Sequence, residues 1–352
     1  MKRYILRVLL LTLLLPLGAC SPFYVLRAGY EQAKILSRRQ PIPRLVEDPR
    51  TDPETREKLR LVLDARDFAA QELSLDAGQS YTTYSWVDSD TLALVLSAAH
   101  KDRFEAHTWW FPIVGSVPYK GFFSERSAQR EIERLQARGL DTSLRPTSAF
   151  STLGWFNDPL MSTLLRYGEV SLVNTVIHEI FHNTYYAAGQ AQFNESVANF
   201  VGARGAIEFF CRREGENGPR CQRARDAWAD DLLFGEFLSA MVADLEALYA
   251  RTELTSEQKV VAREGVFAGA QHEFAETVRP QLRVSTFASF GQEPLNNATL
   301  IGRRLYYGRL DLFELVYERY GRDLPLTIEA IVAAARGTAG DPYAGVEGLL
   351  ER

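Results

Sequence analysis

The chain has 352 residues, 46% of them hydrophobic, and a formal net charge of −5 at pH 7, which suits a globular protein with a large core. An acidic chain without a basic cluster is a poor nucleic-acid binder, so we expect no nucleic-acid partner. A folded part of about 300 residues has room for one large domain or two closely packed lobes.

Residues 1–19 place two basic side chains ahead of an apolar run, which is typical of a signal peptide and short for a transmembrane helix. The Leu-Gly-Ala that precedes Cys20 resembles the lipobox of bacterial lipoproteins, which implies cleavage before Cys20 and its lipidation. Several acyl chains anchor a protein stably in a membrane. We expect a lipid-anchored protein of the bacterial cell envelope, and Ser21 implies the outer membrane, facing the periplasm, in a Gram-negative host. Secretion after cleavage near Ala19 is the alternative.

Residues 20–50 are expected to form a lipidated tether or docking arm ahead of a folded domain at 51–352. Asp52 and Pro53 are typical of the first residues of a helix. Aromatic and β-branched runs then predict strands, and an amphipathic pattern predicts one helix between them. The strands are expected at 81–87, 91–98, 108–114 and 149–153 and the helix at 127–138, so that residues 51–170 form a mixed α/β lobe.

Two segments of this lobe, VPYKGFF at 117–123 and AFSTLGWFNDPL at 149–160, are too rich in aromatic residues and glycine for ordinary surface. A strand at the edge of a cleft can bind a peptide backbone by extending the sheet. Ser151, Thr152, Leu153 and Gly154 are our candidates for that edge strand. An aromatic core beneath a loop is the alternative.

The five residues HEIFH at 178–182 place two histidines four positions apart, with Glu179 directly after the first. On a helix, His178 and His182 lie one turn apart on one face, so both imidazoles can bind one metal ion. Glu179 is then close enough to accept a proton from a water at that ion without being a ligand. A buried helix with two hydrogen-bonded core histidines is the alternative.

A second carboxylate, Glu195, follows His182 after twelve residues and is the candidate third ligand. Residues 185–192 read as a turn around Gly189, and Asn194 is expected to cap the next helix. Small residues on one face of that helix, such as Gly202, favour close approach to the HEIFH helix. Asn199 is a candidate for steadying a ligand. Glu195 acting only as a capping acid in ordinary helix packing is the alternative.

Two histidines and one glutamate leave a fourth position open, which is typical of a catalytic zinc site with a single ion. HEIFH followed by FNESVANFVG resembles the gluzincin metallopeptidases, in which the third zinc ligand is a glutamate of a later helix. VPYKGFF, STLGWFNDPL and PLNNA resemble a family of bacterial lipoproteins named as aminopeptidases. The resemblance implies an α+β, zincin-like fold with the metal between a mixed α/β lobe and a helical lobe at 171–352.

The rest of the helical lobe supplies two further candidates. Cys211 and Cys221 flank a short loop in an exported chain, and we expect a disulfide there, with free buried thiols as the alternative. A tyrosine commonly supports the oxyanion in gluzincins, which makes Tyr306 and Tyr307 candidates, although aromatic residues on helices are more often core. Later helices are expected at 224–251, 256–279, 297–320 and 326–335.

The expected function is zinc-dependent hydrolysis of peptide bonds, with Glu179 as the base and a peptide as substrate. The family resemblance implies an aminopeptidase. The chain lacks the G-x-M-E-N strand through which well-known gluzincin aminopeptidases bind the α-amine, and the spacing of Asp158 and Glu169 selects neither as a substitute. An endopeptidase and a non-catalytic, zinc-containing envelope scaffold or chaperone are the alternatives.

Overall fold

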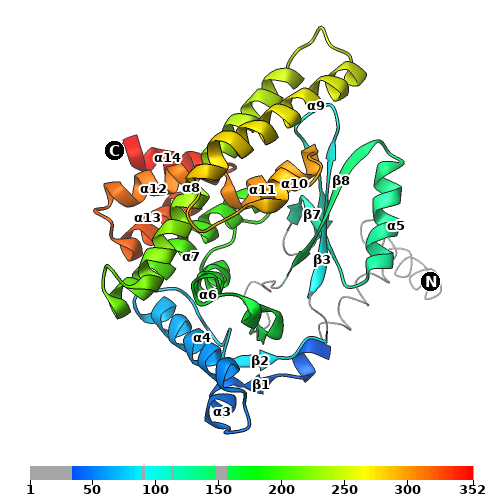
Figure 1. Cartoon of the computed structure of the whole chain (residues 1–352). Coiled ribbons are helices and arrows are strands. Elements are labelled where there is room, and N and C mark those ends of the chain that lie inside the picture. Colours follow the sequence, from blue (N-terminus) through cyan, green and yellow to red (C-terminus); the bar gives the residue numbers. More distant parts are fainter. Residues whose placement is uncertain (1–33, 89–91, 112–114, 148–156, 352) are drawn as a thin grey trace, which may run out of the picture.

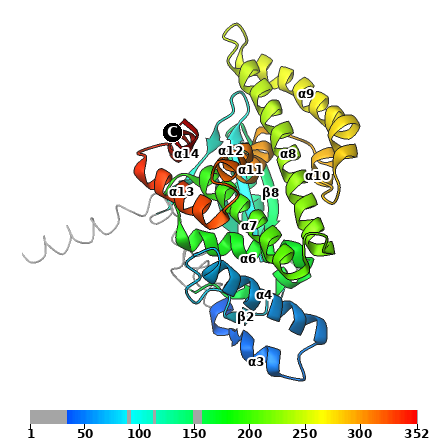
Figure 2. The same cartoon turned by 90° about the vertical axis from the view of Figure 1, so that its left-hand side faces the viewer.

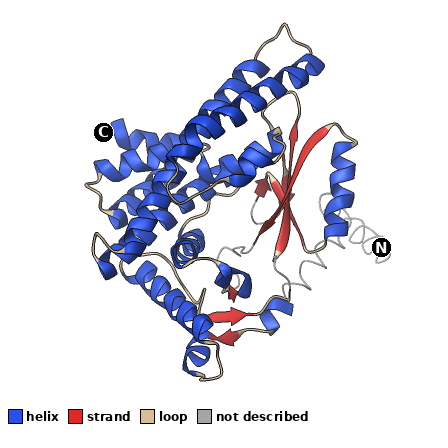
Figure 3. Cartoon of the chain, in the orientation of Figure 1, coloured by secondary structure: helices blue, strands red, loops and turns tan. Residues whose placement is uncertain are grey.

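The structure is a computed structural model that describes residues 34–88, 92–111, 115–147 and 157–351. Strands and a few helices come first along the chain, and the C-terminal part is helical (Figures 1 and 3). The α+β class expected from the sequence is confirmed, and a group of two histidines and one glutamate lies between the two parts.

The first helices lie at one end of the molecule, opposite the end from which the α8–α9 pair projects (Figures 1 and 2). They are α3 (Ile42–Glu47) and α4 (Pro53–Gln71), and the Asp52 carboxylate caps α4 by accepting a hydrogen bond from the Thr55 backbone at 2.9 Å. The buried face of α4 packs on α6 (Glu169–Thr184). A small sheet of β1 (Gln40–Pro41), β2 (Thr83–Ser85) and β9 (Leu160–Met161) adjoins these helices.

The main sheet is antiparallel and has β3 (Ala93–His100) at its centre. β4 (Ala106–His107) and β7 (Tyr119–Phe122) pair with one edge of β3, and β8 (Leu140–Thr147) pairs with the other along its whole length. Figure 1 shows the sheet between α5 (Glu125–Gln136) and α11 (Asn297–Tyr307). A separate hairpin contains β5 (Trp109–Phe111) and β6 (Gly115–Val117).

β8 was not among the strands predicted from the sequence, although it begins at Leu140, directly after α5. Its sequence, LDTSLRPT, has little apolar alternation and contains Pro146, which usually argues against a central strand. β8 tolerates this proline because, among the described residues, β3 is its one strand partner, so the other side of its backbone needs no ladder partner there.

Helices build the C-terminal part, and the structure divides them more finely than the sequence indicated. The expected helix at 297–320 is wrong, because it breaks at Gly308 and Arg309. Arg309 has φ +57°, in the left-handed region, which ends the helical run. After α6 and α7 (Ala191–Glu214), the helices are α8 (Pro219–Tyr249), α9 (Ser256–Glu273), α10 (Ala288–Gln292), α11, α12 (Leu310–Arg319), α13 (Leu324–Gly337) and α14 (Pro342–Glu351).

Two apolar clusters hold these helices together. The larger one surrounds α6 and α7 and contains Phe181, Phe193 and Phe200, all of them almost fully buried. The second joins α8, α9 and α10 through Phe234, Phe267 and Phe290. A disulfide between Cys211 and Cys221 ties the end of α7 to the start of α8, and closing so short a loop stabilises a protein by about 2 to 3 kcal/mol.

The signal peptide at 1–19, Cys20 and the candidate edge strand at 151–154 lie outside the described residues. Within the ranges that the structure covers, no helix combines the length and the apolar character that crossing a membrane requires. The lipid anchor and the edge strand therefore stay predictions.

Candidate metal centre

The two histidines of HEIFH point to the same side of α6. Apolar side chains bury most of this helix, and Val173, Ile177 and Phe181 are fully buried. This packing holds the imidazoles inside the protein, where His178 and His182 are only 8% and 5% exposed. Their Nε2 atoms are 3.2 Å apart, as the one-turn spacing requires.

The turn between α6 and α7 places the third side chain of the group. Gly189 has φ +79°, a conformation that favours glycine. Asn194 is not the N-cap that we expected, because α7 already begins at Ala191. Its side-chain amide instead accepts from the Ala187 N–H at 2.9 Å and donates to the Ala187 carbonyl at 2.8 Å. These two hydrogen bonds fix the turn directly before Glu195 and so determine the position at which Glu195 reaches the site.

Close packing of α7 on α6 brings Glu195 to the histidines. A Cβ atom added at Gly202 would lie 2.5 Å from Asn174 Oδ1, 2.8 Å from its carbonyl oxygen and 3.0 Å from His178 Cβ. Only glycine therefore permits this separation of the helices. With it, Glu195 Oε2 lies 3.4 Å from His178 Nε2 and 3.8 Å from His182 Nε2.

The donor atoms of His178, His182 and Glu195 fit a zinc ion. Ligands bound about 2.0 to 2.1 Å from a tetrahedral ion lie roughly 3.3 Å from one another. The three separations, 3.2, 3.4 and 3.8 Å, are close to that value. At most one of the two facing Nε2 atoms can donate a hydrogen to the other, so a shared cation explains their convergence better than mutual hydrogen bonding does.

Burial and neighbouring charges shift the pKa values of the ionisable groups at the site. Burial disfavours the charged form of Glu195, yet hydrogen bonds from His178 and His182 outweigh it and lower the pKa of this carboxyl group. Burial also opposes a charged imidazole at His182, and the Glu195 carboxylate outweighs it and raises that pKa. Burial raises the pKa of Glu179 above that of an ordinary glutamate, so this carboxylate has an increased tendency to accept a proton.

The structure places the two candidate tyrosines on different sides of α11. The Tyr306 ring stacks beside His178, with 6.2 Å between ring centroids, and the Asn199 amide donates to the Tyr306 carbonyl at 3.1 Å. Asn199 therefore joins α7 to α11 beside the site. Burial and the Glu195 charge raise the pKa of Tyr306, so its hydroxyl keeps its proton.

Tyr307 lies in the second apolar cluster. Its ring centroid is 5.0 Å from that of Phe234 and 5.6 Å from that of Phe287. Near Tyr307, partial burial of Asp231, together with the charge of Asp230, raises the pKa of Asp231 to about 7. Tyr307 therefore belongs to the packing of α8 against α11.

Three residues near the site were missed from the sequence. Arg145 of β8 donates through Nη2 to the Tyr306 hydroxyl at 3.2 Å. The Tyr186 ring lies 6.5 Å from that of His182, and burial raises the pKa of Tyr186 to about 12. Tyr119 of β7 is close enough for the Glu195 charge to reinforce the effect of burial in raising its pKa. The aromatic VPYKGFF segment was a signal for Tyr119, whereas nothing in the spacing pointed to Arg145.

The remaining sequence candidates lie in other surroundings. Glu169 begins α6 and forms an ion pair with Arg220 at 3.1 Å, more than two helical turns from His178. The Asp158 carbonyl accepts a hydrogen bond from the Tyr81 backbone N–H at 2.8 Å. This bond holds Asp158 beside the small sheet of β1, β2 and β9. His272 is exposed on α9.

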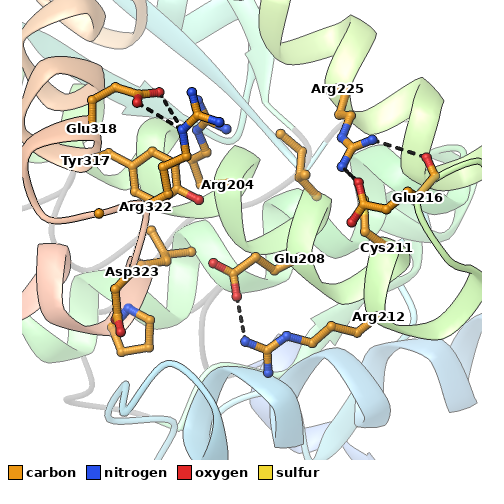
Figure 4. A pocket seen from close by; sticks show the side chains of 14 residues that line it. Arg204, Glu208, Cys211, Arg212, Glu216, Arg225, Tyr317, Glu318, Arg322 and Asp323 are labelled. Carbon is orange, nitrogen blue, oxygen red and sulfur yellow. Dashed lines mark hydrogen bonds and ion pairs between the residues drawn. The ribbon is translucent and has the colours of Figure 1, made fainter.

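A cavity of about 820 Å³ lies elsewhere, between α7 and the α12–α13 connection (Figure 4). It contains four arginines and four acidic residues, so its charges balance. Arg212 is bonded to Glu208, Arg225 to Glu216 and Arg322 to Glu318, while Arg204 pairs with Glu314. None of the three metal-group side chains lines it, and its cations already have acidic partners.

A protein-family model with the description "Putative aminopeptidase" matches residues 23–340. No curated protein and no solved structure matches the chain. The matched range contains the whole metal group and every element from β1 to α13.

Proposed function

Because the chain belongs to the "Putative aminopeptidase" family, we propose that it is a gluzincin-type zinc peptidase with a zincin-like fold that removes residues from the N-terminus of peptides. The observation that carries the proposal is the convergence of His178, His182 and Glu195, with Glu179 directly beside them. A purely structural zinc site has no use for a second carboxylate that is not a ligand.

The side chains divide the chemistry among them. His178, His182 and Glu195 would hold a zinc ion, whose positive charge would polarise the scissile carbonyl and make a nearby water molecule more acidic. The Glu179 carboxylate accepts a proton from the attacking water and passes it to the leaving amine, for which a raised pKa is suitable. The Tyr306 hydroxyl, protonated and next to His178, donates a hydrogen bond to the carbonyl oxygen as it gains negative charge.

The metal and the hydrolysis are tested together. We would measure zinc content and cleavage of a mixed peptide pool for the wild type, Glu179→Gln and the matched control Glu169→Gln, whose carboxylate pairs with Arg220 away from the site. We expect about one zinc per chain in all three, with cleavage lost only in Glu179→Gln. Zinc without cleavage by the wild type would favour a scaffold or chaperone, and no zinc in the wild type would overturn the site.

The choice of peptide end needs its own comparison. An aminopeptidase must bind the free α-amine, so N-acetylation of a peptide should abolish its cleavage. Equal cleavage of acetylated and free peptides would instead identify an endopeptidase, which the missing G-x-M-E-N strand leaves as the second candidate.

We further propose that lipidated Cys20 holds the enzyme in the bacterial envelope, on the periplasmic face of the outer membrane in a Gram-negative host. Cys20→Ser should move the protein from the membrane to the soluble fraction and remove the acyl mass from the mature N-terminus. Unchanged membrane association would contradict the anchor.

A further inference from the structure

A guanidinium group reaches the metal centre from the sheet. Arg145 projects from β8, and its Cζ lies 5.3 Å from the ring centroid of Tyr306, which is 6.2 Å from that of His178. Glu195 and Tyr119 are among the groups whose charges act on it. The Tyr306 ring therefore lies between Arg145 and the proposed zinc ligand His178.

This cation has no acidic partner of its own among the residues that the structure describes. Its hydrogen bond there is to the neutral hydroxyl of Tyr306. Two other arginines of the interior differ, because Arg263 pairs with Asp141 at 2.6 Å and Arg204 pairs with Glu314. Arg303 also lacks an ion pair among the described residues and donates to the Ser289 hydroxyl at 3.1 Å, but it lies away from the metal group. Removing a cation from water without a paired anion is unfavourable, so a substrate anion at Arg145 would replace a missing interaction.

A guanidinium group binds a carboxylate with two parallel hydrogen bonds, which makes a carboxylate the best chemical match. The position of the carboxylate follows from chain length. An extended peptide advances about 3.3 to 3.6 Å per residue, so about three residues beyond the scissile bond span even the longest separation of Arg145 from His178 that these two ring distances allow.

We propose that Arg145 binds the C-terminal carboxylate of peptides of up to about four residues, so that the enzyme prefers short peptides with a free C-terminus. The inference rests on the proposed peptide substrate. It differs from a role in which Arg145 only positions the Tyr306 hydroxyl, because positioning affects all substrates equally, whereas carboxylate binding depends on the charge of the peptide end.

Binding to the zinc-loaded Glu179→Gln protein tests the proposal without relying on turnover. Calorimetry would compare trialanine, its C-terminal amide, and Ala-Ala-Asp amide. We expect trialanine to bind about 10- to 100-fold more tightly than its amide, as two charge-assisted hydrogen bonds allow. In the Glu179→Gln background, a second substitution Arg145→Gln should remove the preference for trialanine. Arg145→Lys should keep part of that preference, and Tyr306→Phe should keep all of it.

Each other outcome has a definite meaning. Equal affinity for trialanine and its amide, or no binding of any peptide, overturns the carboxylate site. Tight binding of Ala-Ala-Asp amide would show that a side-chain carboxylate is the ligand in place of the C-terminus. An unchanged preference in Arg145→Gln, with an unchanged melting temperature, also refutes the role of Arg145. A wild type that prefers trialanine but cleaves nothing would refute hydrolysis and leave the carboxylate site standing.

Discussion

The two faces of α11 carry neighbouring residues of the same type in opposite surroundings. Tyr306 lies beside His178 and bonds Arg145, whereas Tyr307 packs against Phe234 in an aromatic cluster. Burial raises the pKa of both hydroxyl groups, so a raised pKa alone does not distinguish a functional tyrosine from a packed one. The identity of the neighbours does. We therefore expect changes on the metal face to affect turnover and changes on the aromatic face to affect only stability.

The largest effect on the metal face should come from His182→Ala. Loss of one of the three proposed ligands should remove zinc and all measurable turnover, because two ligands seldom hold the ion. Metal analysis after gel filtration would measure this change. The control is His272→Ala, whose imidazole is exposed on α9, and loss of zinc in this variant would argue against the assigned site.

Tyrosine replacements on the two faces test the comparison directly. Tyr306→Phe should lower kcat by about 100- to 1,000-fold with little change in KM, because it removes a donor to the charge that develops in the transition state. Tyr307→Phe should keep wild-type kcat. Steady-state kinetics on one peptide would measure both, and equal losses would abolish the distinction between the faces.

The close approach of α6 and α7 predicts a smaller effect. Gly202→Ala should reduce the free energy of unfolding by about 1 to 3 kcal/mol and weaken zinc binding, because the added Cβ forces the helices apart. Gly265→Ala is the matched control, since nothing lies within 4 Å of its Cβ position on α9. This control should gain about 0.5 to 1 kcal/mol from helix propensity. Urea titrations would measure both, and similar stabilities would contradict the tight packing.

An effect on stability alone, without loss of zinc, belongs to the aromatic face and depends on pH. Asp231 has a folded-state pKa of about 7 against a usual 3.8, so ionisation opposes folding. Its protonated form therefore favours the fold at low pH, and that contribution is lost as pH rises from about 4 through 7. Asp231→Asn should stabilise the protein by about 1 to 3 kcal/mol at pH 8 and by nothing near pH 3.5, with zinc content unchanged. Equal gains in stability at both pH values would refute the raised pKa of Asp231.

The sequence predicted the helical side of the site much better than the sheet side. His178, Glu179 and His182 follow a helical spacing, and the small Gly202 indicated close packing, so local pattern was sufficient. Arg145 lies on a strand whose sequence has no clear alternation, and it meets Tyr306 across 161 positions of chain. Such contacts arise only when the sheet packs on α11.

The points at which helices begin and end were equally hard to predict. Gly308 and Arg309 interrupt a run of apolar spacing that otherwise continues through α12, and periodicity does not register such a break. Asn194 was mistaken for a cap because its amide has the same preference for local backbone groups in either role, and only the position of Ala187 decides between them.

Asn199 and Glu195 lie one turn apart on α7, and this spacing has an evolutionary consequence. One side chain presents a carboxylate to the histidines, and the other holds the backbone of Tyr306. Because each added residue rotates a helix by about 100°, a single insertion between them would turn one contact away from the site while leaving the other in place. Descendants of this protein can lengthen their surface loops freely, but the segment from 195 to 199 tolerates no change of length.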